Sequence, residues 1–187
     1  MRVIAGKYRS RRLSGPGKLR LRPTSDRLRE TLFNILGPSV VDSLFVDLYA
    51  GTGAIGIEAI SRGARLTVFV ESHSASARLV RKNLESLAIS GAAEVIEGDA
   101  VRALEKLAAR RLVADFIFLD PPYEKAEEHL RVLEFLDESH LVAPRGLVIV
   151  EHRRHLELPE RLDRLERTRV VEQGDAALSF YRLAAAA

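Results

Sequence analysis

The chain has 187 residues, enough for one large domain with a sizeable core, and it contains no cysteine. The absence of cysteine excludes disulfide frameworks, zinc sites with thiolate ligands and cysteine nucleophiles. No run approaches the roughly 18 uninterrupted apolar residues of a membrane helix, and the N-terminus lacks the apolar core of a signal peptide, so we expect a cytoplasmic protein with no membrane partner.

The charge is distributed unevenly along the chain. The first 30 residues contain ten basic and two acidic side chains, a net charge of +8, while the other 157 residues carry a net charge of −5. A basic block on a mildly acidic protein indicates contact with a polyanion, above all nucleic acid. A solvated tail is the alternative, but the apolar Val3 and Ile4 and the ring of Tyr8 argue against mere disorder. We therefore expect residues 1–22 to form a basic N-terminal arm or hairpin, with RNA contacts from Lys7, Arg9, Arg11, Arg12 and Arg22, and from Arg27 and Arg29 beyond it.

We expect the main domain to cover residues 23–187. Helical spacing of apolar residues predicts a helix over 24–37 with Thr24 as its N-cap, ended by Gly37-Pro38. Five apolar strands then alternate with amphipathic helices, which predicts a parallel doubly wound sheet. The expected strands cover 43–50, 66–72, 93–99, 113–120 and 146–152, and the helices between them cover 54–62, 74–88, 101–110 and 126–138.

The end of the chain has a different pattern. Residues 165–183 contain two short β-prone runs separated by Gly174-Asp175, which is a hairpin signal. A terminal hairpin places an antiparallel strand in an otherwise parallel sheet.

The first strand continues into "DLYAGTGAIG", where Gly51, Gly53 and Gly56 form G-x-G-x-x-G between a strand and a helix. Such glycines let the backbone approach a ligand closely and turn sharply into the helix. By itself the pattern indicates a dinucleotide, but Asp47 would oppose a pyrophosphate with like charge. S-adenosylmethionine has an ammonium group that suits Asp47, no phosphate, and a carboxylate that a helix N-terminus can receive.

Two further acids end the next two strands. Glu71, 20 residues after Gly51, is placed to accept both ribose hydroxyls, and Asp99 is placed to accept from the adenine amine. Each acid alone fits a solvated strand end or a helix cap equally well, but acids after three successive strands favour a donor site. The candidate donor-binding residues are Asp47, Tyr49, Gly51, Thr52, Gly53, Glu71, Ser72, Asp99 and Ala100, and S-adenosylhomocysteine would be the product.

The segment "DFIFLDPPYEK" ends a buried strand with an acid, two prolines and an aromatic ring. An exocyclic base amine is a poor nucleophile, because its lone pair is delocalised into the ring. If the Asp120 side chain and the Pro121 carbonyl accept its two hydrogens, the lone pair can turn toward a methylsulfonium. Tyr123 offers a ring on which the base can stack. The candidate catalytic residues are Asp120, Pro121, Pro122 and Tyr123; a strand end stiffened by Pro-Pro is the alternative interpretation.

No metal site is predicted. His152 and His155 lie three residues apart in "EHRRH", but ligation would require further ligands that the sequence does not supply. We expect a solvated, charged turn at this position.

Several of these segments together resemble one family. "RPTSDRLRETLFNIL", "DLYAGTGAIGIEAISRGA", the Gly-Asp pair at 98–99 and "LDPPYE" are similar to the RsmD-type 16S ribosomal RNA guanine N(2)-methyltransferases, which have the class I S-adenosylmethionine-dependent fold. The resemblance extends from Met1 to about Arg182. It implies an α/β fold with a doubly wound, mostly parallel sheet of seven strands, the last of them antiparallel, plus a small basic N-terminal extension. "DPPY" alone is shared by many amino-methyltransferases.

The resemblance also implies methyl transfer to the 2-amino group of one guanine in 16S ribosomal RNA or the assembling small subunit, by a monomer. Two alternatives stay open. A DNA or other RNA adenine amino-methyltransferase would use the same "DPPY", but usually needs an added target-recognition region. A non-catalytic RNA-binding assembly factor would explain the basic arm without explaining Asp120.

Overall fold

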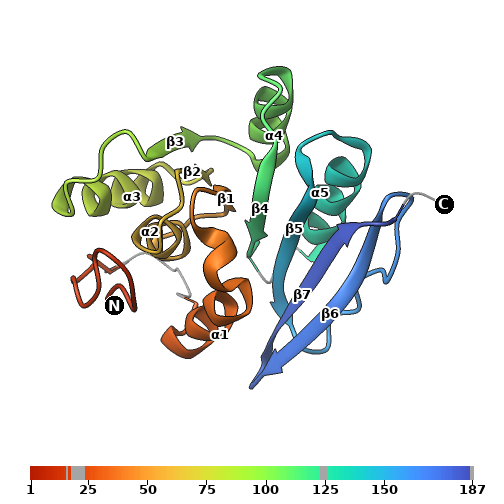
Figure 1. Cartoon of the computed structure of the whole chain (residues 1–187), viewed down its shortest axis with the longest axis horizontal. Coiled ribbons are helices and arrows are strands. Elements are labelled where there is room, and N and C mark those ends of the chain that lie inside the picture. Colours follow the sequence, from red (N-terminus) through yellow and green to blue (C-terminus); the bar gives the residue numbers. More distant parts are fainter. Residues whose placement is uncertain (16, 18–23, 123–125, 186–187) are drawn as a thin grey trace. The chain divides into compact units, whose positions relative to one another are not determined.

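The computed structural model describes residues 1–15, 17, 24–122 and 126–185 (Figure 1). The helices are α1 (Asp26–Leu36), the 3-10 helix η1 (Gly37–Val40), α2 (Ala54–Ser61), α3 (Ser74–Ser86), α4 (Ala100–Ala109) and α5 (Ala126–Glu138). The strands are β1 (Leu44–Leu48), β2 (Leu66–Glu71), β3 (Ala93–Glu97), β4 (Ala114–Leu119), β5 (Val142–Arg153), β6 (Leu165–Gln173) and β7 (Ala176–Leu183). They form a seven-stranded sheet in the order β3-β2-β1-β4-β5-β7-β6. The predicted fold class of a mostly parallel, doubly wound sheet is confirmed. Within the described ranges, no helix is long and apolar enough to cross a membrane.

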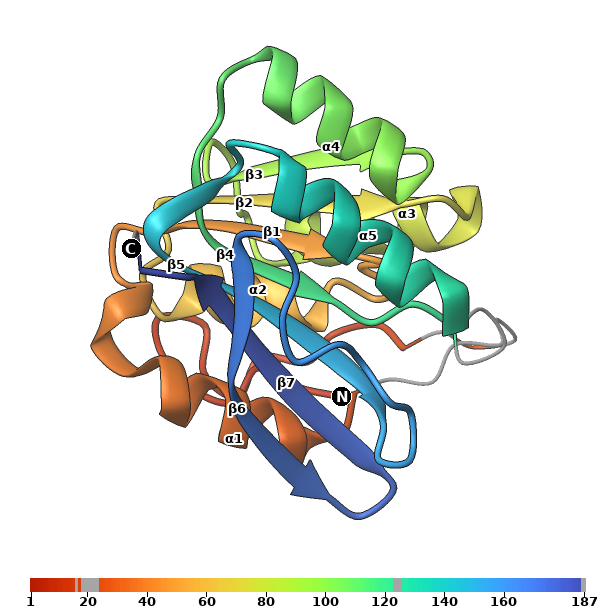
Figure 2. The same ribbon diagram turned by 90° about the vertical axis from the view of Figure 1, so that its right-hand side faces the viewer.

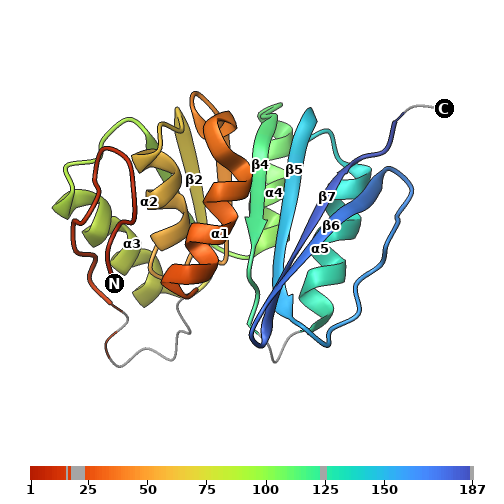
Figure 3. The same cartoon turned by 60° about the horizontal axis from the view of Figure 1, so that its bottom comes forward.

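The chain divides into two compact units, residues 1–99 and 100–187. In the first unit, β1, β2 and β3 are parallel neighbours. Helix α2 packs on β1 and β2, and α3 packs on β2 and β3 (Figure 3). All five residues of β1 are buried, as a parallel strand covered on both faces requires.

In the second unit, β4 and β5 are parallel, and β7 pairs antiparallel with both β5 and β6. Figure 2 shows β6 and β7 as two long arrows joined by a tight turn. That turn is Gly174-Asp175, between Gln173 and Ala176, so the predicted hairpin and its antiparallel strand are confirmed.

Three local predictions need correction. The N-cap of α1 is Ser25 rather than Thr24, since the Ser25 hydroxyl accepts from the Leu28 N–H at 3.1 Å. Strand β5 begins at residue 142 rather than 146, because its pairing with β4 continues across a register shift near Pro144. His152 does not lie in a solvated turn; it is buried in β5, with Nε2 2.9 Å from the Ser179 hydroxyl.

The described part of the N-terminal arm is folded against the first unit (Figure 1). Arg2 and Arg12 form an antiparallel bridge, and the Val3 N–H donates to the Arg11 carbonyl at 3.0 Å. The side chains of Val3 and Leu13 are buried in a cluster that includes residues of α2 and α3. Burying such a side chain contributes about 1.5–3 kcal/mol, so these two residues hold the arm to the domain. The expected boundary between residues 22 and 23 lies outside the described residues.

Close packing of α2 on β2 depends on Gly56, and this yields a first prediction. A Cβ at this position would lie 2.2 Å from Phe69 Cε1 and 2.8 Å from Thr67 Cγ2. Gly56→Ala should therefore lower the free energy of unfolding by about 1–3 kcal/mol in urea titrations. Gly15→Ala is the matched control, because a Cβ at Gly15 meets nothing within 4 Å. Equal stability of the two variants would contradict the packing argument.

Candidate functional site

The loop between β1 and α2 has an unusual backbone. Gly51 and Gly53 have φ of 56° and 77°, in the left-handed region that glycine tolerates. Tyr49 adopts φ of 62° although it has a Cβ, which costs about 1–2 kcal/mol. Such strain is retained where the surrounding structure enforces it, and it clusters at ligand sites. This backbone conformation explains why the sequence has glycine at positions 51 and 53. It also identifies residues 49–53 as a candidate ligand-binding loop.

Of the predicted donor-binding acids, Glu71 holds this loop and Asp47 holds the start of α2. The two carboxylate oxygens of Glu71 accept from the Gly51 N–H and the His73 N–H, each at 2.8 Å. Asp47 is buried in β1, and its Oδ2 accepts at 2.9 Å from the N–H of Gly56, which belongs to the first turn of α2. Because each carboxylate oxygen has a second lone pair, these bonds leave Glu71 able to accept from a ligand. These backbone contacts of Asp47 and Glu71 were not foreseen from the sequence.

The buried position of Asp47 changes its titration. The pKa of its carboxyl is raised from 3.8 to about 7, chiefly by burial and to a smaller extent by the charge of Glu71, against the opposing effect of the Gly56 N–H bond. Asp47 can therefore hold a proton near neutral pH until a cationic group approaches.

A second side chain supports the loop and was not predicted. Asn83, in the last turn of α3, is fully buried, and its Nδ2 donates to the Thr52 carbonyl at 2.9 Å. The N–H of the same Thr52–Gly53 peptide donates to the Ala50 carbonyl at 2.7 Å. The sequence did contain a signal, because asparagine favours caps and turns over helix interiors and therefore needs a reason to occupy one.

The other predicted donor-binding residues lie at strand ends, as chain order requires. Ser72 is exposed directly after β2, and Asp99 is half-buried after β3. Ala100 is the first residue of α4 and is buried. Their contacts with a donor stay predictions.

The candidate catalytic residues belong to the second unit. Asp120 follows β4 and is half-buried, Pro121 is buried and Pro122 is exposed. Tyr123 lies outside the described residues. The roles of Asp120, Pro121, Pro122 and Tyr123 therefore stay predictions.

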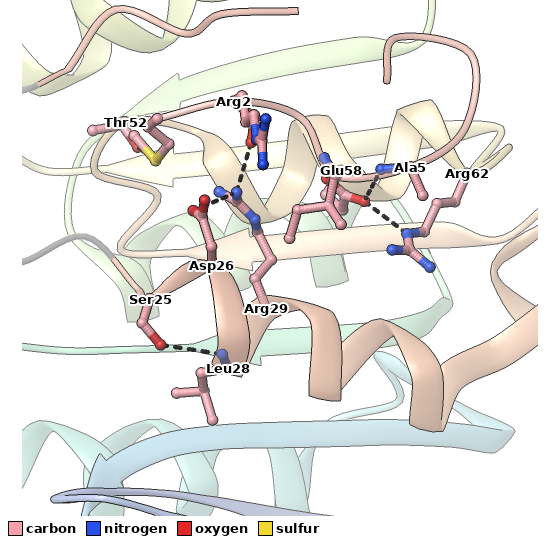
Figure 4. Close-up of polar contacts among 11 residues, drawn as sticks. Arg2, Ala5, Ser25, Asp26, Leu28, Arg29, Thr52, Glu58 and Arg62 are labelled. Carbon is pink, nitrogen blue, oxygen red and sulfur yellow. Dashed lines mark hydrogen bonds and ion pairs between the residues drawn. The ribbon is translucent and has the colours of Figure 1, made fainter. Parts of the chain in front are cut away.

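Of the seven predicted RNA contacts, five are exposed: Lys7, Arg9, Arg11, Arg12 and Arg27. Arg22 lies outside the described residues. Arg29 needs correction, because its side chain has no exposed surface and cannot reach a phosphate. Its Nη2 donates to the Arg2 carbonyl at 2.6 Å and to Asp26 Oδ1 at 3.0 Å (Figure 4). Burial lowers the pKa of the Arg29 guanidinium from its usual value, while the charges of Asp26 and Glu58 raise it.

The arm is fastened to α2 by a buried acid that the sequence did not single out. Glu58 has no exposed surface, and its carboxylate accepts from the Ile4 N–H at 2.8 Å and the Ala5 N–H at 3.0 Å. The guanidinium of Arg62 donates to the same group at 2.8 Å (Figure 4). Every residue of α2 is buried, so a glutamate within it was a readable signal for a specific partner.

Metal sites and cavities are the other kinds of candidate site to consider among the described residues. The described residues contain no group of three or more His, Asp or Glu side chains that could hold a metal ion. A cavity of about 560 Å³ in the second unit is lined by Ala108, Arg111, Leu112, Val113, Phe135, Glu138, Ser139 and His140. It borders the residues that precede β4, whereas Asp120 follows the strand. The cavity is therefore separate from the candidate catalytic residues.

The chain is similar to several known methyltransferases. A family described as conserved hypothetical protein 95 matches residues 1–182. The putative rRNA methyltransferase YlbH of Bacillus subtilis is 37% identical over 182 residues, which cover 97% of this chain and 98% of that protein. The ribosomal RNA small subunit methyltransferase D of Escherichia coli K12 is 38% identical over 153 residues, covering 81% of this chain and 74% of that protein.

Solved structures extend the comparison. The putative methyltransferase yhhF from Escherichia coli superposes with a TM-score of 0.85 at 31% identity, covering 100% of this chain and 99% of that one. An RNA methyltransferase from Salinibacter ruber, solved with S-adenosyl-L-homocysteine, has a TM-score of 0.66 at 16% identity and covers 89% of this chain and 96% of that one. At that identity the likeness concerns the fold alone.

The titration of Asp47 yields a second prediction. Because its pKa is about 7 in the folded chain and near 3.8 in the unfolded chain, the folded chain binds the extra proton. This extra proton contributes its full share of the free energy of unfolding below about pH 4. The contribution is lost as the pH rises toward 7, by up to about 1.4 kcal/mol per pH unit. Asp47→Asn should remove this loss, so the unfolding free energies of wild type and variant should diverge between pH 4 and 7. The exposed Asp163→Asn serves as the control. Parallel profiles for wild type and Asp47→Asn would show that Asp47 titrates normally.

Proposed function

Because the chain belongs to the family described as conserved hypothetical protein 95, whose relatives include the ribosomal RNA small subunit methyltransferases D, we propose that it is an rRNA methyltransferase. It transfers the methyl group of S-adenosylmethionine to the 2-amino group of a guanine in 16S ribosomal RNA. The observation that carries the proposal is the loop at residues 49–53, in which Tyr49, Gly51 and Gly53 have positive φ. The Gly51 N–H of this loop donates to the carboxylate of Glu71. The acid after β4, Asp120, supplies the amine acceptor.

The donor set fits S-adenosylmethionine chemically. Glu71 holds the loop through its N–H bonds and keeps lone pairs for ribose hydroxyls. Asp47, with its pKa near 7, can ionise when an ammonium group approaches. A bound S-adenosylmethionine supplies an electrophilic methyl group on a positively charged sulfur.

The roles of the chain in the transfer follow from the acceptors at the end of β4. Asp120 and the Pro121 carbonyl accept the two amine hydrogens and direct the nitrogen lone pair toward the methyl carbon. A bond forms from nitrogen to that carbon while the bond from carbon to sulfur breaks, and the electron pair of the broken bond stays on sulfur. The extra proton on nitrogen is then released to solvent. Holding the reactants in line lowers the barrier by about 7–11 kcal/mol.

Transfer of labelled methyl groups tests the proposal directly. The substrates are naked 16S rRNA, small-subunit particles, DNA and protein, and digestion of the product identifies the modified nucleoside. We expect N2-methylguanosine in rRNA. N6-methyladenosine in DNA or RNA would identify an adenine amino-methyltransferase instead, and no transfer to any substrate would favour a binding factor.

Asp120 and Glu71 should separate chemistry from donor binding. Asp120→Ala should abolish methyl transfer and change the dissociation constant for S-adenosylhomocysteine by no more than a few-fold, because Asp120 is assigned to the base. Glu71→Gln should weaken S-adenosylhomocysteine binding about tenfold or more, since hydrogen bonds to charged groups contribute about 1.5–3 kcal/mol. Calorimetry measures the dissociation constant for S-adenosylhomocysteine in both variants. Lost donor affinity in Asp120→Ala would remove the assigned role of Asp120.

The exposed basic residues of the arm give a salt-dependence prediction. Replacing Arg9, Arg11 and Arg12 by alanine should weaken RNA binding and flatten its log–log salt slope by about 0.7–0.9 for each lost phosphate contact. The matched control replaces Arg145, Arg161 and Arg169, which are exposed and belong to the second unit. An equal loss of slope in both triple variants would indicate a general charge effect and not an RNA-binding arm.

A further inference from the structure

One buried amide contacts both the candidate donor loop and the N-terminal arm. Asn83 Nδ2 donates to the Thr52 carbonyl at 2.9 Å and to the Ser14 carbonyl at 3.2 Å. Its Oδ1 accepts from the Ser14 N–H at 2.8 Å. The orientation of the amide is fixed by these partners, because two carbonyl oxygens require the NH₂ group and one N–H requires the oxygen. Asn83 therefore joins two segments that are about 40 residues apart in sequence.

A second contact links the same two segments. The Thr52 hydroxyl lies 3.9 Å from Met1 Sδ, and Thr52 itself is buried. Beneath them, the arm residues Val3 and Leu13 share one buried cluster with Ala54 of α2 and Val80 of α3. The donor loop and the arm thus rest on a common apolar base, and Asn83 supplies their shared hydrogen bonds.

A buried amide at this position lowers the stability of the fold unless its polar atoms are hydrogen-bonded. An apolar side chain of similar shape could fill the space, but it would leave the Thr52 carbonyl and the Ser14 N–H and carbonyl without the partner that Asn83 provides, which is destabilising. Asparagine is also a poorer helix former than leucine. The three bonds of Asn83 are therefore the feature that an apolar replacement could not reproduce.

We propose that Asn83 is a positioning residue that couples the methyl-donor loop to the RNA-binding arm, so that S-adenosylmethionine and RNA bind cooperatively. This inference rests on the proposed function. A donor that fixes residues 49–53 also fixes the Thr52 carbonyl and the Asn83 amide, and the amide in turn fixes Ser14 in the arm. Coupling between two binding sites is reciprocal, so RNA on the arm strengthens donor binding by the same factor.

The test measures that factor. The dissociation constant of S-adenosylhomocysteine is determined with and without saturating 16S rRNA transcript, and that of the transcript with and without saturating S-adenosylhomocysteine. The full chain is compared with Asn83→Ala and with Asn83→Asp, which keeps the acceptor for the Ser14 N–H but places an oxygen against two carbonyls. Asn34→Ala is the matched control, because Asn34 is the other asparagine of the chain and is exposed on α1.

We expect wild type and Asn34→Ala to bind each ligand about fivefold or more tightly when the other is present. The factor should fall to about one in both Asn83 variants, and a merely structural role would weaken binding without changing this ratio. Thermal unfolding of each variant identifies one that does not fold, and the other then provides the measurement.

Two outcomes overturn the coupling and leave the proposed function standing: wild type that binds both ligands independently, or a folded Asn83 variant with the wild-type factor. A wild-type chain that binds neither ligand, and transfers no methyl group, would instead overturn the proposed function together with this inference.

Discussion

The carboxylate of Glu58 is the constraint on which the arm depends. An ionised group with no exposed surface is tolerated only when its charge and lone pairs are satisfied. The Ile4 and Ala5 N–H groups and the Arg62 guanidinium provide these partners. Peeling the arm away would break two of the three hydrogen bonds of this carboxylate, and each hydrogen bond to a charged group contributes about 1.5–3 kcal/mol. The arm is consequently part of the folded unit along residues 1–14, although its composition is that of a tail.

The candidate donor loop follows the same physical rule. Its Gly51 N–H donates to the buried carboxylate of Glu71, and its Thr52 carbonyl accepts from Asn83, while Asp47 accepts from the Gly56 N–H at the start of α2. A left-handed Tyr49 would not persist in an isolated peptide, because such strain is retained only where the surrounding structure enforces it. Glu71 of β2 and Asn83 of α3 hold the loop residues that follow it. The loop is therefore arranged before any ligand arrives, and preorganisation of this kind reduces the ordering cost of binding.

Most of the fold could be predicted from the sequence because its signals are local. Strand and helix periods, the Gly174-Asp175 turn and the helix stop at Gly37 each act within a few residues. The errors arose where neighbouring choices were equivalent locally. Thr24 and Ser25 are both suitable caps, and only the geometry of α1 selects Ser25. The apolar run at 146–152 does not show that β5 begins at Val142, because the shifted pairing of β4 and β5 that includes Val142 is set by tertiary structure.

The site was predictable only in part. Acids after successive parallel strands necessarily share one end of the sheet, so Asp47 and Glu71 could be named in advance as candidates. Glu58 and Asn83 gave only the signal of a polar side chain inside a helix, and Arg29 gave none. Their partners could not be named, because these lie in segments whose path is fixed by tertiary packing.

Arg29 is the clearest case of a residue whose environment could not be predicted from the sequence. It resembles its exposed neighbour Arg27 in sequence, yet it lies fully inside and donates to the Arg2 carbonyl. That bond ties the arm to α1 just as Glu58 ties it to α2, so the arm backbone is held from two helices. The exposed side chains of Arg9, Arg11 and Arg12 then project from a backbone that is already ordered. Phosphate contacts made by such side chains lose less conformational entropy than contacts from a disordered tail, because only side-chain freedom remains to be lost.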